Sequence, residues 1–272
     1  MIGGVWVTQF HESLRGIILV GFALLLINLI VSEKLANFIS PKMHIYVYIA
    51  LFIFLLLGFI LILSSSSEMN AHQCGCAGDH SVPKTIFGSI FVYSLFIFPL
   101  VTGFLFSDHI LTNDAAIKRG HKYGEGIFSS TSNGNPPSDP NLTSLEAKKI
   151  ILLTNENFLP VLDQIERNLQ HFVGKKVQLE GFVYREPDFT KDQIVVARFG
   201  VSCCTADAVV FGMAVNGDSL SSLSNDTWIR VKGTIDVLHY NDSELPVIVD
   251  PTVEKIDTPS QPYVYDTYEQ NE

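Results

Sequence analysis

Three long runs of uncharged, mostly apolar residues dominate the first 107 positions of the chain. They cover residues 16–32, 45–67 and 85–107. Each run is close to the ~17–25 residues that an α-helix needs to cross a bilayer core. Because a helix satisfies its backbone hydrogen bonds internally, we predict three membrane-spanning helices. Three buried helices of a soluble core, the alternative, are disfavoured because the runs follow one another so closely.

Few polar groups interrupt these runs. Asn28 in the first predicted helix is expected to face another helix, and Pro99 in the third removes one backbone hydrogen bond and is expected to kink it. A transport pathway normally requires more polar or ionisable groups within the membrane. We therefore expect that a larger multi-helix partner, and not this chain alone, forms any pathway through the bilayer.

The pattern changes after the third run. Residues 120–141 are rich in Gly, Ser, Asn and Pro, a composition that cannot bury a core, and residues 108–143 are predicted to be a flexible linker. From Ser144 to Phe172 apolar residues recur at three- to five-residue intervals, which predicts one or two short amphipathic helices. Gly174 then provides a natural end to the helical segment.

Alternating apolar and polar positions follow, and they predict five strands. The predicted strands are Lys176–Tyr184, Gln193–Ser202, Ala208–Val215, Trp228–Leu238 and Pro246–Ile256. Five strands with turn residues between them, the fourth with a central glycine, fit a small OB-like β-barrel. The predicted fold class is therefore membrane α plus all-β. It comprises a three-helix transmembrane domain (1–107), the linker (108–143), an OB-like β-barrel domain (144–257) and an acidic tail (258–272).

Charge is distributed as unevenly as hydrophobicity. Residues 1–106 contain four basic and four acidic side chains, so the whole net charge of −10 belongs to the remainder of the 272-residue chain. A hydrophobic share of 47% argues against disorder, and four cysteines are too few for a disulfide-stapled scaffold of this length. A nucleic-acid partner is excluded because binding phosphates requires a basic face. These features favour a membrane protein that carries an acidic soluble domain.

The charges that flank the helices give conflicting indications of topology. With the N-terminus inside, the cytoplasmic flanks hold Arg15 and Lys84, whereas the outer flanks hold Lys34, Lys42, Lys118, Arg119 and Lys122. Counting positive charges alone favours the reverse orientation. However, Arg15 directly precedes the first helix, which usually dominates, and a long acidic domain can translocate regardless of nearby charges. We expect a multi-pass protein of the cell membrane with an extracellular C-terminal domain.

The segment between the second and third predicted helices, residues 68–84, contains two thiols and two imidazoles. These are His72, Cys74, Cys76 and His80. Thiolate and imidazole suit Zn²⁺, with Cu(I) as a competitor, whereas Mg²⁺ and Ca²⁺ prefer oxygen. The Cys-x-Cys spacing differs from the Cys-x₂-Cys of structural zinc sites, so an open, transient site is predicted. A disulfide, or a flexible polar loop with incidental ligands, remains the alternative.

A second cluster lies in the segment Arg198-Phe-Gly-Val-Ser-Cys-Cys-Thr-Ala-Asp207. Adjacent residues of a strand point to opposite faces, so Cys203 and Cys204 are predicted to lie on a turn at a strand end. Three interpretations stay open: a strained vicinal disulfide, a thiolate pair that binds a soft metal with Asp207, and two small residues packed at a barrel rim. Arg198 is expected either to lower the pKa of a nearby thiol or to pair with Asp207.

No enzymatic activity is predicted. A catalytic cysteine requires a neighbouring base, and the sequence positions of His171 and His239 do not place either imidazole beside Cys203 or Cys204. A membrane thiol oxidoreductase would require a Cys-x₂-Cys motif beside a helix, which the sequence lacks.

Several segments along the chain are similar to one family. They are Ile39-Ser-Pro-Lys-Met43, the Cys/His-rich loop, Gly174–Tyr184, Val196–Phe199, the paired-cysteine run Cys203–Ala208, which is the most specific, and Trp228–Gly233. Over nearly its full length the chain resembles the YcgQ-like subunits of bacterial two-component permeases. The resemblance implies a membrane subunit that accompanies a larger multi-helix permease, often linked with metal-homeostasis genes, and without an established reaction.

Two functional hypotheses follow. The first is an accessory subunit of a permease complex that handles zinc or another transition metal through the Cys/His loop and the cluster of Cys203, Cys204 and Asp207. The second is an envelope-anchored binding or scaffolding protein with a ligand-binding β-barrel and purely structural cysteines. In the first hypothesis zinc is bound by the thiols and imidazoles, and the larger subunit forms the path.

Overall fold

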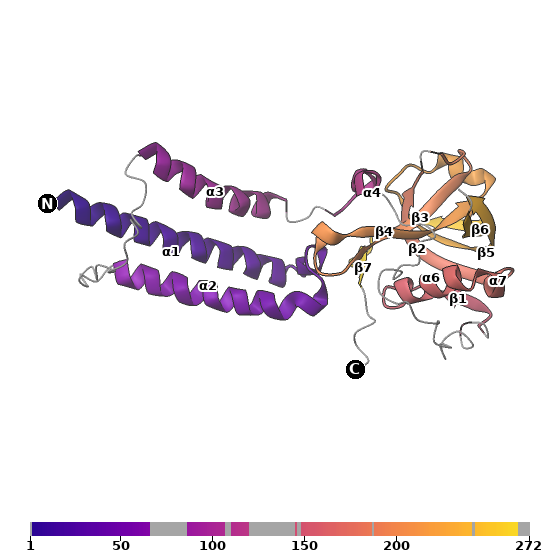
Figure 1. The fold of residues 1–272 in the computed structure, drawn as a ribbon, viewed down its shortest axis with the longest axis horizontal. Helices are drawn as coiled ribbons and strands as arrows, with labels where there is room; N and C mark the ends of the chain where they lie inside the picture. The colour runs from indigo at the N-terminus through magenta and orange to yellow at the C-terminus, as the bar shows by residue number, and fades with distance from the viewer. Residues whose placement is uncertain are drawn as a thin grey trace. The chain divides into compact units, whose positions relative to one another are not determined.

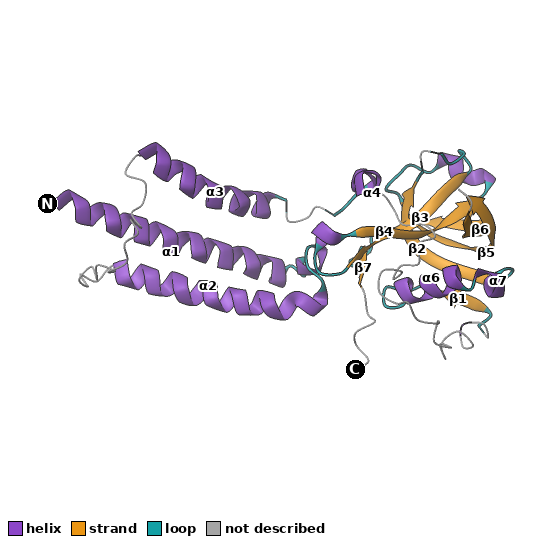
Figure 2. Cartoon of the chain, in the orientation of Figure 1, coloured by secondary structure: helices purple, strands orange, loops and turns teal. Residues whose placement is uncertain are grey.

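The computed structural model of the chain describes residues 2–65, 86–106, 110–119, 145, 148–186, 188–240 and 243–265. The chain separates into two compact units, Met1–His109 and Ile110–Glu272. The first contains long helices and the second contains the strands (Figures 1 and 2).

The helices of the first unit are α1 (Ile2–Val31), α2 (His44–Ser65) and α3 (Ile86–Leu105), with two short 3₁₀ turns, η1 (Leu35–Asn37) and η2 (Pro41–Met43), between α1 and α2. Within the described residues, three helical segments are long and apolar enough to cross a membrane by length and composition: Ser13–Val31, Pro41–Leu63 and Phe87–Leu105. The three predicted helices are thus confirmed as candidate spans. Most of their large apolar side chains are exposed, which suits a lipid environment.

Small residues let α1 and α2 approach closely. A Cβ atom added to Gly16 would lie 2.9 Å from Cγ1 of Ile62 and 3.2 Å from the carbonyl oxygen of Gly58. Such contacts between small residues favour helix association in a bilayer, where burial of apolar surface gives little driving force. Asn28, expected to face another helix, is exposed within the described part of this unit and lies near the end of the candidate span Ser13–Val31.

The second unit consists mainly of strands. They are β1 (Ile150–Leu152), β2 (Lys176–Tyr184), β3 (Gln193–Val201), β4 (Val209–Asn216), β5 (Trp228–Tyr240), β6 (Ser243–Lys255) and β7 (Tyr263–Tyr265). Its helical elements are α4 (Asn113–Arg119), α6 (Phe158–Arg167), α7 (Leu169–Phe172), η3 (Thr205–Asp207) and η4 (Asp218–Ser222).

The strands form one sheet in the order β1-β2-β5-β6-β4-β3-β7, and β2 also pairs with β3. The five longer strands therefore form a ring of pairings. Neighbours in this ring are antiparallel, except for the parallel pair β4 and β6. The five predicted strands are confirmed as elements of a mostly-sheet domain, whereas the OB-like assignment stays a prediction.

The core lies inside the ring and under α6. Phe158, Leu162 and Ile165 on one face of α6 are at most 1% exposed and pack with the inward side chains of the strands. These three residues are three or four positions apart, which is the amphipathic pattern of a helix that covers a sheet. A second apolar cluster contains Phe182, which stacks on Phe199 at a centroid separation of 5.2 Å.

Three elements depart from the predicted bounds of the second unit. β1 lies in the stretch predicted to be helical, where it pairs in parallel with β2. β7 lies in the predicted acidic tail and pairs with β3. α4 lies in the predicted linker and belongs to this unit, because the Leu111 N–H donates to the Tyr263 hydroxyl (2.8 Å) and the Asn113 N–H donates to Asp226 Oδ1 (2.6 Å). Residues 120–144 lie outside the described residues.

Gly233 of β5 provides a test of the strand ring. The pairing of β5 with β6 shifts register between Lys232 and Thr234, and a Cβ atom on Gly233 would lie 2.4 Å from Cγ2 of Ile248 and 2.6 Å from the carbonyl oxygen of Val249. Gly233→Ala should therefore destabilise the unit by about 1–3 kcal/mol, the usual cost of overpacking. Thermal unfolding of the detergent-solubilised chain measures this loss.

Lys232→Ala, at the neighbouring exposed position, is the matched control and should leave the unfolding temperature nearly unchanged. Equal unfolding temperatures for Gly233→Ala and the parent chain would contradict the close approach of β5 and β6.

Candidate functional site

The two adjacent cysteines lie on the turn that joins β3 to β4. The ladder of these antiparallel strands ends at the pair Gly200 and Val209, and the chain between them crosses from one strand to the other. Cys203 is exposed and Cys204 is partly buried, and both are free thiols. Their Sγ atoms lie 3.8 Å apart, compared with about 2.05 Å in a disulfide. The turn thus presents two sulfur atoms side by side at the surface.

The carboxylate of Asp207 holds this turn together. Its Oδ1 accepts a hydrogen bond from the Ser202 N–H (3.1 Å), and its Oδ2 accepts from the N–H groups of Cys203 (2.7 Å) and Cys204 (3.4 Å). Cys204 is also the N-cap of η3, and its side chain and that of Asp207 form a reciprocal capping arrangement. Because three successive N–H groups converge on one carboxylate, the backbone of the turn is fixed in this conformation.

The same carboxylate changes the acidity of the cluster. Hydrogen bonding of the Cys203 thiol to Asp207, and then to Cys204, raises the pKa of Cys203 to about 11. Partial burial acts to raise the pKa of Asp207, but hydrogen bonds from the Cys203 thiol and from the three N–H groups hold it below its usual value. Cys203 is consequently protonated at neutral pH while Asp207 is ionised, the opposite of what a nucleophilic cysteine requires.

One sulfur atom each from Cys203 and Cys204 and one oxygen of Asp207 all lie within 4.8 Å of one another. Two sulfur donors and one carboxylate match the ligand preferences of Zn²⁺, which is usually bound by four ligands in a tetrahedron. Three donors from one exposed turn leave a fourth position for water or for a ligand from another molecule. The arrangement can therefore bind a metal that is exchanged, with loss of the thiol protons.

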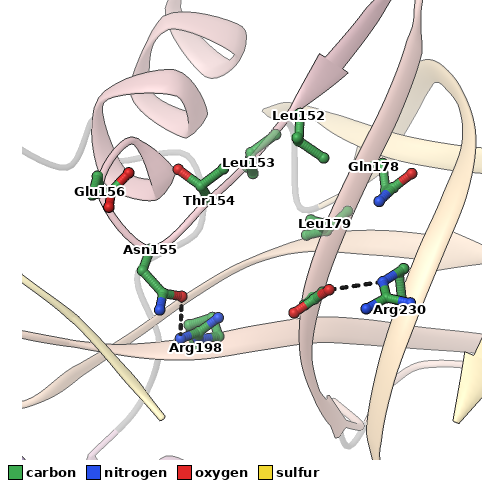
Figure 3. Close-up of a pocket in the computed structure, with 10 residues that line it drawn as sticks. Leu152, Leu153, Thr154, Asn155, Glu156, Gln178, Leu179, Arg198 and Arg230 are labelled. Atoms are coloured by element: carbon green, nitrogen blue, oxygen red, sulfur yellow. Dashed lines mark hydrogen bonds and ion pairs between the residues drawn. The ribbon is translucent and has the colours of Figure 1, made fainter. Parts of the chain in front are cut away.

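Arg198 does not lie in this cluster. Its guanidinium is buried, 2% exposed, and donates to the carbonyl oxygens of Gln261 (2.7 Å) and Pro262 (3.2 Å) and to Asn155 Oδ1 (2.8 Å). Figure 3 shows the contact with Asn155. The expectation that Arg198 pairs with Asp207 or lowers a thiol pKa was wrong, because Arg198 lies within β3 and is bonded elsewhere, whereas Asp207 lies in η3 beyond the end of the strand. The described groups that shift the Cys203 pKa raise it.

The four residues predicted to form the other metal site, His72, Cys74, Cys76 and His80, lie outside the described residues. Their role as ligands stays a prediction. Of the seven predicted metal ligands, the structure brings together Cys203, Cys204 and Asp207.

Sequence reasoning missed the surroundings of Arg198. Asn155 follows β1, which was predicted to be helical, so nothing in the sequence placed it near β3. Glu180 and Arg230 are paired directly across β2 and β5, and Arg230 Nε donates to Glu180 Oε1 at 2.7 Å. Alignment of the predicted strands Lys176–Tyr184 and Trp228–Leu238 in antiparallel register could have found this pair, because opposite charges at facing positions stabilise a sheet.

Comparison with known proteins connects both units to one family. Residues 14–122 match the DUF1980 N-terminal domain, and residues 130–266 match the DUF1980 C-terminal domain. The chain belongs to the DUF1980 family. The two matches together include the candidate spans except for Ser13, the segment that holds His72, Cys74, Cys76 and His80, and the cysteine turn.

Two relatives are similar over nearly their full lengths. The UPF0703 protein YcgQ of Bacillus subtilis is 29% identical over 92% of this chain and 98% of its own length. A protein of Streptococcus mutans, named as a two-component membrane permease complex subunit, is 25% identical over 93% of this chain and 98% of its own length. The resemblance to YcgQ-like subunits is thus confirmed. No solved structure matches the chain.

Replacement of Asp207 tests its control of the thiols. Asp207→Asn removes the negative charge and the carboxylate acceptor that raise the Cys203 pKa, so this pKa should fall from about 11 toward an ordinary ~8.5. At pH 8 alkylation of Cys203 by iodoacetamide should then become on the order of tenfold faster or more, because the thiolate fraction increases. Mass spectrometry of the full chain measures the rate at Cys203 itself.

Asp218→Asn, on the exposed turn η4, removes the same charge elsewhere and should leave the rate unchanged. If Asp207→Asn slowed the alkylation of Cys203, the assigned role of the carboxylate would be refuted.

Proposed function

We propose that the chain is an accessory membrane subunit of a permease complex and that it handles zinc or another transition metal. The observation that carries the proposal is the convergence of two thiols and a carboxylate within 4.8 Å on an exposed turn. The subunit is not itself an enzyme. It captures the metal and presents it to the larger subunit that forms the path.

The chemistry of the turn favours a borderline or soft metal. Sulfur donors select zinc or Cu(I) over Mg²⁺ and Ca²⁺, and the carboxylate of Asp207 adds a negative charge that favours a divalent ion. Zinc–sulfur bonds are about 2.3 Å long, so two sulfur atoms 3.8 Å apart are at the separation of ligands on one tetrahedral ion. Because Asp207 already fixes the backbone, binding requires little reorganisation of the turn.

The requirement for a partner comes from the first unit. The three candidate spans carry mostly apolar side chains. In α3 the hydroxyls of Ser94 and Thr102 donate to carbonyl oxygens of their own helix. Such helices offer no path for an ion. The name of the Streptococcus mutans relative, a subunit of a two-component membrane permease complex, supports a division of labour in which a multi-helix partner provides that path.

The finer features of the proposal concern the second unit and the loop. The five-stranded ring with its single parallel pair supports an OB-like β-barrel as the domain that presents the cysteine turn. We place this domain on the extracellular side of a multi-pass bacterial cell-membrane protein. His72, Cys74, Cys76 and His80 form a second, transient zinc site in the loop between the candidate spans.

Elemental analysis of the purified full-length chain tests the metal. After incubation with zinc and removal of the excess, Cys203→Ser with Cys204→Ser should lose about one equivalent, because the turn then retains one of three donors. Cys74→Ser with Cys76→Ser should lose the metal of the loop. Ser202→Ala, in the same turn but with only its backbone used by Asp207, is the matched control.

The pH dependence gives an independent check. Zinc must displace the Cys203 proton, whose pKa is raised to about 11, so the apparent affinity should increase by about tenfold per pH unit for this proton and by at least about 100-fold from pH 6 to pH 8. A zinc content that Cys203→Ser with Cys204→Ser leaves equal to that of the parent chain would exclude the turn as a site. Zinc transport into vesicles by the isolated chain would contradict the accessory role.

Labelling in intact cells tests the sidedness. The chain has four cysteines, so Cys74→Ser, Cys76→Ser and Cys204→Ser leave Cys203, which is exposed. A membrane-impermeant maleimide should label it without permeabilisation if the domain is extracellular. Labelling that requires permeabilised cells would place the domain in the cytoplasm.

A further inference from the structure

A cavity of about 610 Å³ lies in the second unit, on a different part of the sheet from the cysteine turn. It is lined by the end of β1 and the loop that follows, by residues 178–180 of β2, and by one arginine each from β3 and β5 (Figure 3). Along the same edge of β2, the pairing with β1 ends at Gln178 and the pairing with β3 begins at Phe182. The cavity thus lies between β1 and β3, at the part of the β2 edge that pairs with neither strand.

Arg198 supplies a buried positive charge to this cavity. Its three described hydrogen bonds go to uncharged oxygens, and its guanidinium carbon lies 5.2 Å from the ring centroid of Trp228 and 6.0 Å from that of Phe158. Among the described residues no carboxylate forms an ion pair with it. Burial lowers the pKa of Arg198 to about 10, so it remains charged at neutral pH. The carboxylate of Glu180 attracts Arg198 without forming an ion pair and is itself bonded to Arg230, so it offsets the cost of burial only in part. An anion in the cavity would offset more of this cost.

The donors of Arg198 are also incompletely used. A guanidinium has five N–H groups, and the described bonds start from Nε and Nη2 only. No described residue accepts a hydrogen bond from Nη1. This arrangement leaves donors for a ligand, and guanidinium donors match the oxygens of a carboxylate or phosphate.

The second arginine of the cavity is already neutralised. Arg230 donates to Glu180 Oε1 (2.7 Å) and to Glu254 Oε2 (2.8 Å). Leu152, which is 48% exposed, adds an apolar wall. The cavity therefore combines a buried cation, which forms no ion pair with a described carboxylate, with an apolar wall and with the carboxylates of Glu156 and Glu180.

We propose that this cavity binds a small organic anion, with its carboxylate or phosphate group against Arg198 and its apolar part against Leu152. The proposal is independent of the metal function, because it uses none of the metal ligands. It assigns to the domain a second binding activity at a distinct place.

Trp228 offers a reporter for this site. The chain contains two tryptophans, Trp6 in α1 and Trp228, so Trp6→Phe leaves only the indole that contacts Arg198. The purified full-length Trp6→Phe chain is titrated at constant ionic strength with cyclohexanecarboxylate, with the corresponding neutral amide and with inorganic phosphate. At least one of the two anions should give a saturable change in fluorescence, with half-saturation on the order of millimolar or below, and the amide should give none.

The anion that binds identifies the preferred group, carboxylate or phosphate. In the same background, Arg198→Gln should weaken its binding by about tenfold or more, the usual loss for a charge-assisted hydrogen bond. Arg185→Gln is the matched control, because Arg185 donates to the Leu220 carbonyl oxygen outside the cavity and its loss changes the net charge equally. The affinity of this control should equal that of the parent.

Arg198→Gln also removes bonds that fix Asn155 and the segment before β7, so a second variant separates binding from folding. Glu156 lines the cavity and is exposed, and Glu156→Gln removes a repulsive charge without disturbing the core. It should strengthen anion binding by about twofold. The proposal is overturned by any of three results: no saturable signal with either anion, equal binding of the amide, or no strengthening by Glu156→Gln.

Discussion

The convergence of three backbone N–H groups on the carboxylate of Asp207 is the interaction on which the candidate metal site depends. Adjacent cysteines in a regular strand would point to opposite faces. The carboxylate bends the chain at the end of β3 so that both sulfur atoms lie on the same side of the turn. It also holds Cys203 protonated, which makes the pair poor in nucleophilic chemistry and leaves it available to a metal that can displace the proton.

The two units of the chain meet different physical requirements. The helices of the first expose apolar side chains and approach one another through glycines, as expected where the surroundings are as apolar as the side chains themselves. The second unit buries apolar side chains inside a ring of strands and under an amphipathic helix. This closed ring leaves turns at its ends, and the turn between β3 and β4 carries the cysteines.

Arg198 and Asp207 show how tertiary structure separates neighbours in sequence. They belong to one short segment of the chain, yet the arginine contributes to a cavity beside β2 whereas the carboxylate organises the surface turn. β3 continues past Arg198 for three residues before it ends. The strand therefore separates the two charges. Arg198 forms no ion pair with a described carboxylate, whereas Asp207 accepts hydrogen bonds from three N–H groups.

The sequence by itself determined the three apolar helices, the five long strands and the position of the paired cysteines at a strand end. These features follow from the local periodicity of apolar residues and from the length of the uncharged runs. Both signals are properties of neighbouring residues and do not depend on tertiary contacts. The same local signals placed Cys203, Cys204 and Asp207 in one group.

Only the tertiary structure decided the places of β1, β7 and α4, and with them the surroundings of Arg198. β1 and β7 have three residues each, too few for a periodic pattern, and each becomes a strand because a longer strand offers it a free edge. Asn155 and Gln261 contact Arg198 across 43 and 63 positions of sequence. Contacts at such separations depend on how the whole chain folds, and a local pattern of hydrophobic and polar residues does not encode them.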